Sequence, residues 1–156
     1  EIVGYGMSSD AKDMVNPDTE GPNEAMRGAL KDAGLSPSDI QYLNAHGTAT
    51  TINDANETRA IKAVFGNHAK NLAISSTKSM HGHPLGAGGG IEAAACIMAM
   101  QENWVPPTIG LDEADPECDL DYIPNAGRKL DVTYAMSNSF AFGGLNAVLV
   151  FGPPPA

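Results

Sequence analysis

The sequence predicts an α/β domain whose mixed, mostly parallel five-stranded sheet is covered by helices. Short apolar runs, typical of buried strands, alternate with longer segments in which apolar residues recur at helical spacing. This alternation favours parallel strands joined by crossover helices, in the order β-α-β-α-β-α-β-β. A short turn with two glycines separates the last two strands, which indicates that this pair is antiparallel.

The individual elements are marked by apolar runs and by the residues that stop them. Asn23 is placed to cap the first helix, and Gly34 and Gly66 end the first two helices. Residues 104–128 are rich in proline and acidic residues, which predicts an ordered surface excursion. The expected elements, in chain order, are a short buried strand at 2–7, a helix at 23–33, a strand at 40–45, a helix at 54–65, a strand at 72–75, a helix at 88–101, and strands at 132–137 and 146–151.

The composition indicates one globular domain, which we assign to residues 1–152, followed by a short tail at 153–156. Of 156 residues, 42% are apolar and 18% are charged, which is enough apolar surface for a core. The formal net charge of −10 argues against binding nucleic acid or an anionic membrane surface through bulk charge. No segment is long and apolar enough to span a membrane, and no signal peptide is visible.

The two cysteines favour a reducing, cytoplasmic setting, since two thiols in such a chain do not make a disulfide scaffold. Cys96 lies in an apolar run, where a buried and inert thiol is expected. Cys118 lies in an acidic loop, which does not favour a lowered pKa. The chain begins at Glu1, without a methionine and directly in a strand-like run, so we interpret it as a piece of a longer protein.

Two histidines beside glycines follow neighbouring strands of the predicted sheet. His46 lies in the segment NAHGT, and His83 lies in KSMHGHPLG after the next strand. Strand ends followed by such turns are where α/β folds place catalytic groups, and neutral imidazoles aimed at one point can hold charge that develops on an oxygen. Lys78 precedes His83, and Glu57 is its expected ion-pair partner, which would join the two turns. No cysteine or serine sits in an obvious nucleophile turn.

A metal site is the main alternative for these histidines. His81 and His83 are spaced as His-x-His, and His46 could be a third ligand. Asp54 or Glu57 could then supply a carboxylate. The helical His-x-x-x-His pattern and a cysteine pair are both missing, so the sequence favours a site without metal.

Three further features have structural interpretations. The glycine-rich loop at 82–90 lacks both the dinucleotide fingerprint and the Gly-Lys-Ser/Thr of a P-loop, which favours tight packing over phosphate binding. Two phenylalanines on the glycine turn at 140–144 are typical of hairpin packing. His68 is expected to be a solvated loop residue. Taken without any resemblance, the residues indicate an α/β enzyme domain with a two-histidine site.

Four motifs of this chain, taken together, resemble those of the C-terminal half of a β-ketoacyl-acyl carrier protein synthase, a condensing enzyme of the thiolase fold. Any one motif is only suggestive, whereas four in this order are specific and extend over nearly the whole chain. The motifs are an opening strand at 3–11, the first histidine motif at 44–50 with Asp54 and Glu57 downstream, the lysine and second-histidine motif at 76–87, and a phenylalanine gate at 138–146. The resemblance implies that the predicted sheet is one thiolase-like half.

The resemblance also implies the reaction, a decarboxylative Claisen condensation of a malonyl thioester with an acyl-enzyme in fatty acid or polyketide-like biosynthesis. His46 and His83 would bind the malonyl thioester carbonyl and stabilise the enolate that forms when carbon dioxide leaves. Lys78 would order the site through Glu57. The substrates would be acyl and malonyl thioesters of acyl carrier protein or coenzyme A, with no metal and no other cofactor.

The same resemblance implies contacts for the rest of the substrate. Thr48 and Thr50 would contact the pantetheine arm. Phe142 would serve as the gate, and its backbone N–H would form part of the oxyanion hole for the acyl thioester. Phe140 and Gly143 would complete the substrate side of this turn.

Three departures from the family pattern indicate a specialised branch, such as a nodulation-type or polyketide-type synthase. His81 stands where relatives commonly have threonine, so we treat it as a neighbour of the site. Ala141 replaces a glycine that is common in the gate, and its methyl group could stiffen the gate or narrow the acyl channel. The segment 11–14 lacks the tyrosine-histidine pair of many relatives.

The family nucleophile is a cysteine in the N-terminal half, and neither Cys96 nor Cys118 matches it. We therefore expect this chain alone to be inactive, and the missing half to be its partner, together with acyl carrier protein and a second copy in a homodimer. Two other classes compete with this interpretation. A non-catalytic chain-length partner would be expected to have lost its histidines and Lys78, and a thiolase would carry a cysteine in place of Phe142.

Overall fold

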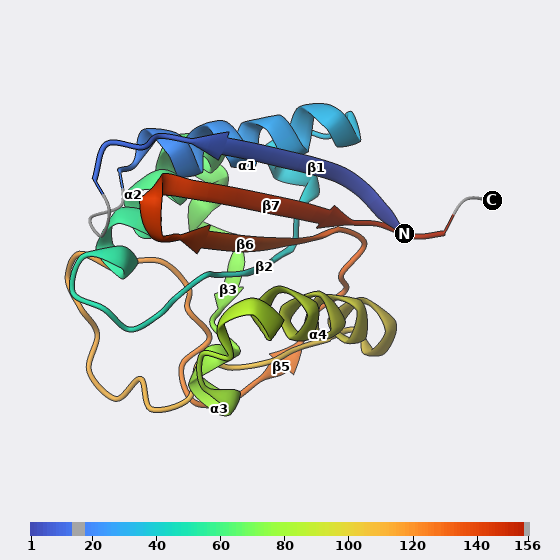
Figure 1. Cartoon of the computed structure of the whole chain (residues 1–156). Coiled ribbons are helices and arrows are strands. Elements are labelled where there is room, and N and C mark those ends of the chain that lie inside the picture. The colour runs from blue at the N-terminus through green and yellow to red at the C-terminus, as the bar shows by residue number, and fades with distance from the viewer. Residues whose placement is uncertain (14–17, 155–156) are drawn as a thin grey trace.

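The computed structural model describes residues 1–13 and 18–154, and these residues form one mixed five-stranded sheet with helices on both faces (Figure 1). Part of the segment 11–14 and part of the tail 153–156 lie outside the described residues. The strand order is β1-β7-β6-β2-β3. The strands are β1 (Ile2–Ser9), β2 (Tyr42–Asn44), β3 (Ala73–Ser75), β6 (Ala135–Ala141) and β7 (Leu145–Phe151).

The prediction of a mixed five-stranded sheet is confirmed, but its strand pairings are not mostly parallel. β2 is parallel to both β3 and β6, whereas β7 is antiparallel to both β6 and β1. The pairings are therefore divided equally between the two kinds, because the first strand joins the last hairpin at the edge of the sheet. The hairpin between β6 and β7 has the antiparallel geometry expected from its glycine turn.

Helices follow the strands in the predicted order β-α-β-α-β-α-β-β, with short additional elements between them. The helices are α1 (Glu20–Ala33), α2 (Asn53–Phe65), α3 (Lys78–His81) and α4 (Gly88–Glu102). Short 3-10 helices are η1 (Pro37–Asp39), η2 (Gly66–Lys70), η3 (Leu85–Ala87) and η4 (Phe142–Gly144). A small ribbon pairs β4 (Trp104–Val105) with β5 (Arg128–Lys129).

The two faces of the sheet carry separate apolar cores. On one face α1 and α2 bury side chains such as Met26 and Ile61 against Leu43 of β2. On the other face α4 buries Cys96 against Tyr42 of β2 (Figure 1). The sheet edge at the ends of β2 and β3 therefore lies between helices of both layers.

Helix α1 begins earlier than its cap residue predicts. It starts at Glu20, so Asn23 lies in its first turn and the predicted Asn23 cap is wrong; the Asn23 backbone N–H donates to the Thr19 carbonyl instead. The predicted end at Gly34 is confirmed, since its φ of 67° lets the chain turn away while its N–H bonds the last carbonyls. Close packing against β1 requires Gly6, where a Cβ atom would lie 1.9 Å from the Ala25 carbonyl oxygen.

Two apolar surfaces remain open to solvent in this chain. β1 is an edge strand rather than a buried one, because Tyr5 and Met7 point away from α1 and are exposed. Helix α4 is apolar nearly all round but buries only one stripe, so that Ile91, Ile97 and Met98 are exposed. Over residues 1–13 and 18–154, none of the helices combines the length and apolar character needed to cross a membrane.

The predicted excursion at 104–128 is ordered and packs against the outer edge of the sheet. The Ile74 N–H on β3 donates to the Asp121 carbonyl over 2.9 Å, and Ile123 is fully buried. Thr108 forms a bridge with Pro124. The excursion thereby covers the edge of β3 and forms one wall of the site described next.

Candidate functional site

The two histidine turns meet at one edge of the sheet. β2 and β3 are parallel neighbours that end level with each other at Asn44 and Ser75, so both following turns leave from the same edge. The imidazole rings of His46 and His83 lie 5.6 Å apart between centroids and meet edge to face at 84°. The structure therefore brings together the pair of histidines that the sequence singled out.

His46 lies in a dry environment that keeps its imidazole neutral. Only 9% of the residue is exposed, and the Phe140 ring packs 5.6 Å from its ring. Burial, followed by the charges of Lys78 and His83, lowers the pKa of His46 to about 3. A neutral imidazole can donate one hydrogen bond without giving up its proton, which is the property needed to stabilise an oxyanion.

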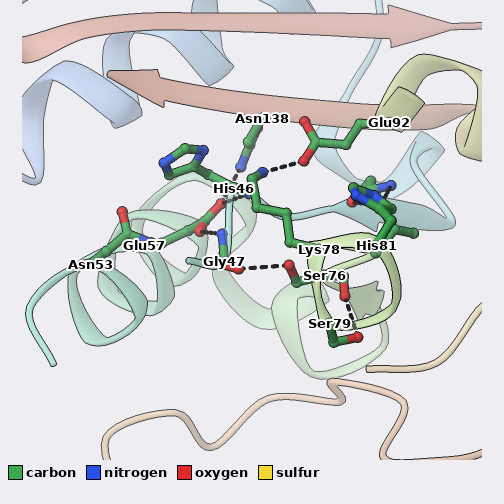
Figure 2. Close-up of polar contacts among 12 residues, drawn as sticks. His46, Gly47, Asn53, Glu57, Ser76, Lys78, Ser79, His81, Glu92 and Asn138 are labelled. Carbon is green, nitrogen blue, oxygen red and sulfur yellow. Dashed lines mark hydrogen bonds and ion pairs between the residues drawn. The ribbon is translucent and has the colours of Figure 1, made fainter. Parts of the chain in front are cut away.

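Glu57 holds the backbone of the first histidine turn (Figure 2). Its carboxylate accepts hydrogen bonds from the backbone N–H groups of His46 and Gly47, each over 2.9 Å. The side-chain amide of Asn138 donates a third, over 3.0 Å. Burial raises the pKa of Glu57, and these three hydrogen bonds oppose that rise. Glu57 thus fixes the position of His46 from the α2 side of the sheet.

Lys78 forms its ion pair with Glu92 of α4, so the predicted pairing with Glu57 is wrong. The side chains of Lys78 and Glu92 are almost completely buried, and Figure 2 shows them joined while Glu57 faces the first turn. Burial raises the pKa of Glu92, and Lys78 opposes that rise. The physical reason for the difference is that Glu57 already has three donors, whereas α4 brings an unpaired carboxylate to the same edge from the other face.

Sequence reasoning missed Glu92, although one signal for it exists. Glu92 is the only charged residue between positions 88 and 101, in a helix that is otherwise apolar. A buried carboxylate needs a partner, so an isolated acid in an apolar helix predicts a buried contact with a cation. Asn138 was missed as well; it is a fully buried amide that stands between two serines in β6.

The two turns are also joined by a direct contact between Ser76 and Gly47. The Ser76 hydroxyl donates to the Gly47 carbonyl over 2.7 Å. Gly47 has a φ of 39°, and a Cβ atom there would lie 2.5 Å from the Ser76 Cβ, so the close approach requires glycine. Ser76 in turn accepts a hydrogen bond at its backbone carbonyl from the Ser79 hydroxyl over 2.8 Å (Figure 2).

His81 does not join the other two histidines. Its Nε2 lies 3.3 Å from the Thr77 hydroxyl, and Figure 2 shows the ring on the far side of Lys78 from His46. Within the described parts of the chain, no group of three or more histidine, cysteine, aspartate or glutamate side chains is arranged to hold a metal ion. The geometry therefore gives no support to the three-histidine metal hypothesis. His68, expected to be solvated, is half-buried against the Ile40 carbonyl.

A cleft of about 880 Å³ opens beside His83, between the two histidine turns and the excursion at 104–128. Thr48 and Thr50 line it, and their hydroxyls lie 3.0 Å apart. Cys118 also lines the cleft, and burial raises the pKa of its thiol, which makes it a poor nucleophile. Cys96 is fully buried with a raised pKa, as the sequence predicts for an inert thiol, and both cysteines are free.

The turn between β6 and β7 separates its two phenylalanines. Phe140 is buried beside His46, whereas Phe142 is 72% exposed at the tip, next to Gly143 with its φ of 77°. The base of the turn is anchored by Asp10 and Asn146, which donate to the Gly144 carbonyl over 3.0 and 2.9 Å. Only Phe140 of this turn belongs to the wall of the histidine site in this structure.

Fold and geometry together define a class of site. A neutral, buried imidazole faces a second imidazole at the edge of a sheet, and the second imidazole lines a cleft of about 880 Å³. Such a site is suited to stabilising negative charge on a substrate oxygen. Residues 1–112 match the protein family described as beta-ketoacyl synthase, C-terminal domain, and the chain belongs to this family.

Curated relatives agree with this membership. Nodulation protein E of Rhizobium sp. (strain N33) is 56% identical over 151 residues, which cover 97% of this chain and 38% of that protein. The 3-oxoacyl-[acyl-carrier-protein] synthase 2 of a Synechocystis species is 57% identical over 153 residues, covering 97% of this chain and 37% of that protein. This chain therefore spans less than two fifths of the length of these relatives.

Solved structures agree on the fold. A type II PKS ketosynthase in complex with its acyl-carrier protein superposes with a TM-score of 0.95 and is 39% identical, over 99% of this chain and 38% of that one. The ketosynthase architecture of the thiolase-like fold is thereby shown for the described elements. The predicted family is confirmed.

Proposed function

We propose that this chain is the enolate-stabilising half of a 3-oxoacyl-[acyl carrier protein] synthase. The observation that carries the proposal is the facing pair of His46 and His83, with His46 kept neutral by burial. Loss of carbon dioxide from a malonyl thioester leaves the electrons of the broken carbon–carbon bond as an enolate. The two imidazoles donate N–H groups to its oxygen, where the negative charge collects.

The second step joins the enolate carbon to an acyl group. That carbon attacks the carbonyl of an acyl thioester, and the thiolate of the acyl-enzyme leaves as the new carbon–carbon bond forms. Cys96 and Cys118 both have raised pKa values, so neither suits the role of acyl carrier. We assign the nucleophile to the further part of the protein that the longer relatives possess, and we expect this chain alone to be inactive.

The substrates in this proposal are acyl and malonyl thioesters carried by acyl carrier protein or coenzyme A. The cleft beside His83 would hold the pantetheine arm, with Thr48 and Thr50 as its hydrogen-bond partners. Phe142 and Gly143, at the exposed tip of the β6–β7 turn, would close over the acyl group, with the Phe142 N–H in the oxyanion hole. Neither a metal nor another cofactor has a role in this scheme.

The open apolar surfaces support the proposed partners. Acyl carrier protein is proposed as substrate carrier because a related ketosynthase structure contains one. The further part of the protein would cover Ile91 and Met98 of α4 together with Met7 of β1, since exposed apolar helix faces of this kind are normally buried. Homodimer formation would then involve the complete protein. A cytoplasmic location is consistent with two free cysteines.

The central test is decarboxylation of malonyl-coenzyme A by the complete protein that contains this chain. We expect His46→Ala and His83→Ala each to lower kcat by about 10²- to 10³-fold, the usual cost of removing one oxyanion donor. His68→Ala is the matched control, because His68 lies outside the site against the Ile40 carbonyl and should keep the wild-type rate. Full rates in both site variants would show that the enolate-stabilising role is wrong.

A further inference from the structure

Thr77 is at the centre of a small hydrogen-bonded cluster that the proposed reaction does not use directly. It lies between β3 and α3 and is only 3% exposed. Its hydroxyl oxygen lies 3.1 Å from the amide nitrogen of Asn44 and 3.4 Å from the amide oxygen of the same side chain. The ring of His81 contacts it from the solvent side over 3.3 Å.

This cluster connects the two segments that carry the catalytic histidines. Asn44 is the last residue of β2 and precedes His46 by two positions, while Thr77 directly precedes Lys78 at the start of the segment that leads to His83. The backbone pairing of β2 with β3 ends at Asn44. Beyond that point, side-chain contacts such as that between Thr77 and Asn44 hold the two diverging turns at a fixed distance.

Loss of the contact between Thr77 and Asn44 would be costly because both side chains are buried. Asn44 is fully buried, so its amide depends on a partner within the protein. Placing a reacting group about 1 Å away from its productive position can cost about 10²-fold in rate. A residue that fixes the separation of the His46 and His83 rings therefore influences the rate without touching the substrate.

We propose that Thr77 is a positioning residue whose hydroxyl, by holding Asn44, sets the spacing of His46 and His83 on the enolate oxygen. This inference rests on the function proposed above. His81 is the outer member of the cluster and orients the Thr77 hydroxyl, which gives this residue a role in the site although its ring lies on the far side of Lys78 from His46 (Figure 2).

The test compares two conservative substitutions in the complete protein, with malonyl-coenzyme A as the probe. Thr77→Val keeps the shape of threonine but removes the hydroxyl, and Thr77→Ser keeps the hydroxyl. We expect Thr77→Val to lower kcat, measured per active site, by about 10- to 100-fold with KM within about twofold of wild type. Thr77→Ser should remain within about threefold of the wild-type kcat, because positioning depends on the hydroxyl.

A double-mutant cycle shows whether Thr77 acts through the histidines. In a His83→Ala background, adding Thr77→Val should change kcat by less than about twofold, because there is no longer a pair to position. An equal loss in both backgrounds would overturn the proposal, as would a wild-type kcat in Thr77→Val. If His83→Ala alone keeps the full rate, the proposed function fails instead, so the two failures are distinguishable.

A second variant separates positioning from stability. Asn44→Leu combined with Thr77→Val replaces both partners by apolar groups, so no buried amide is left unpaired and the fold should be kept. We expect a midpoint of urea unfolding near that of wild type together with the same low kcat as Thr77→Val. A wild-type kcat in this double variant would overturn the inference even if Thr77→Val alone does not fold.

Discussion

The charge state of His46 follows from its burial next to two other basic groups. Burial, then Lys78 and His83, lower its pKa to about 3, so the imidazole is neutral throughout the physiological range. Glu57 reaches the same turn through backbone hydrogen bonds rather than through the ring. The ring N–H therefore remains available for a substrate oxygen while the main chain is held in place.

The lowered pKa of His46 predicts a loss of stability in acid. Between about pH 6.5 and pH 3 the unfolded chain binds a proton at this position that the folded protein excludes, so the free energy of unfolding falls as the pH falls. Between pH 7 and pH 5 the free energy of unfolding should fall by about 2 kcal/mol through this group.

Urea unfolding of wild type and His46→Asn at pH 7 and pH 5 measures this effect. Asparagine does not titrate, so the variant should lose about 2 kcal/mol less than wild type between the two pH values. Any packing cost of the substitution is the same at both pH values and cancels in the difference. Equal losses in the two proteins would contradict the lowered pKa.

At the scale of the elements, the buried pair of Lys78 and Glu92 joins α3 to α4. Removing one partner from a buried pair leaves an uncompensated charge, so we expect Glu92→Gln to lower the free energy of unfolding by about 3 kcal/mol. The matched control is Asp119→Asn, which breaks an exposed ion pair with Lys62 and should cost at most about 1 kcal/mol.

Chemical denaturation measures the free energy of unfolding of Glu92→Gln and Asp119→Asn. A double variant then tests whether the loss comes from the unpaired buried charge. Lys78→Met combined with Glu92→Leu removes both charges and should recover most of the lost stability, because no buried charge remains. Equal costs for Glu92→Gln and Asp119→Asn would mean that burial of the α3–α4 pair has no energetic consequence.

The sequence predicted those features that depend on neighbouring residues and on the topology of parallel strands. His46 and His83 follow adjacent parallel strands, and their meeting at one sheet edge therefore follows from the strand order alone. The partner of Lys78 depends instead on where α4 lies after it crosses the sheet, which no local pattern contains. For this reason the sequence pattern predicts Glu57 as the partner, whereas the structure pairs Lys78 with Glu92.

The start of α1 and the exposure of β1 also depend on tertiary contacts that no local sequence pattern contains. Asn23 is a good cap residue, but the helix extends back to Glu20, so a local preference did not decide the boundary. The apolar run at the start of the chain resembles a buried strand, yet β1 pairs only with β7 among the described strands and leaves Tyr5 exposed. Tertiary neighbours decided both outcomes.

For the whole molecule, the arrangement of apolar surface matters more than its net charge. Helix α4 covers β2 and β6 on its face of the sheet, while none of the helices in residues 1–13 and 18–154 lies over β1 on that face (Figure 1). On the flank of α4 that faces solvent, Ile91, Ile97 and Met98 are exposed. This face of β1 and the helix flank together form the surface on which we place the further part of the protein.

A single charge on that flank should therefore prevent assembly of the two parts. When this chain and the remaining part of the complete protein are expressed as separate polypeptides, we expect them to co-purify. Met98→Glu should weaken their association at least about tenfold, because a carboxylate would be buried in the interface without a partner. Lys31→Glu, an exposed change on α1 at the opposite face, is the control and should leave co-purification intact. Undiminished association of Met98→Glu, measured by size-exclusion chromatography, would show that the other part binds elsewhere on this chain.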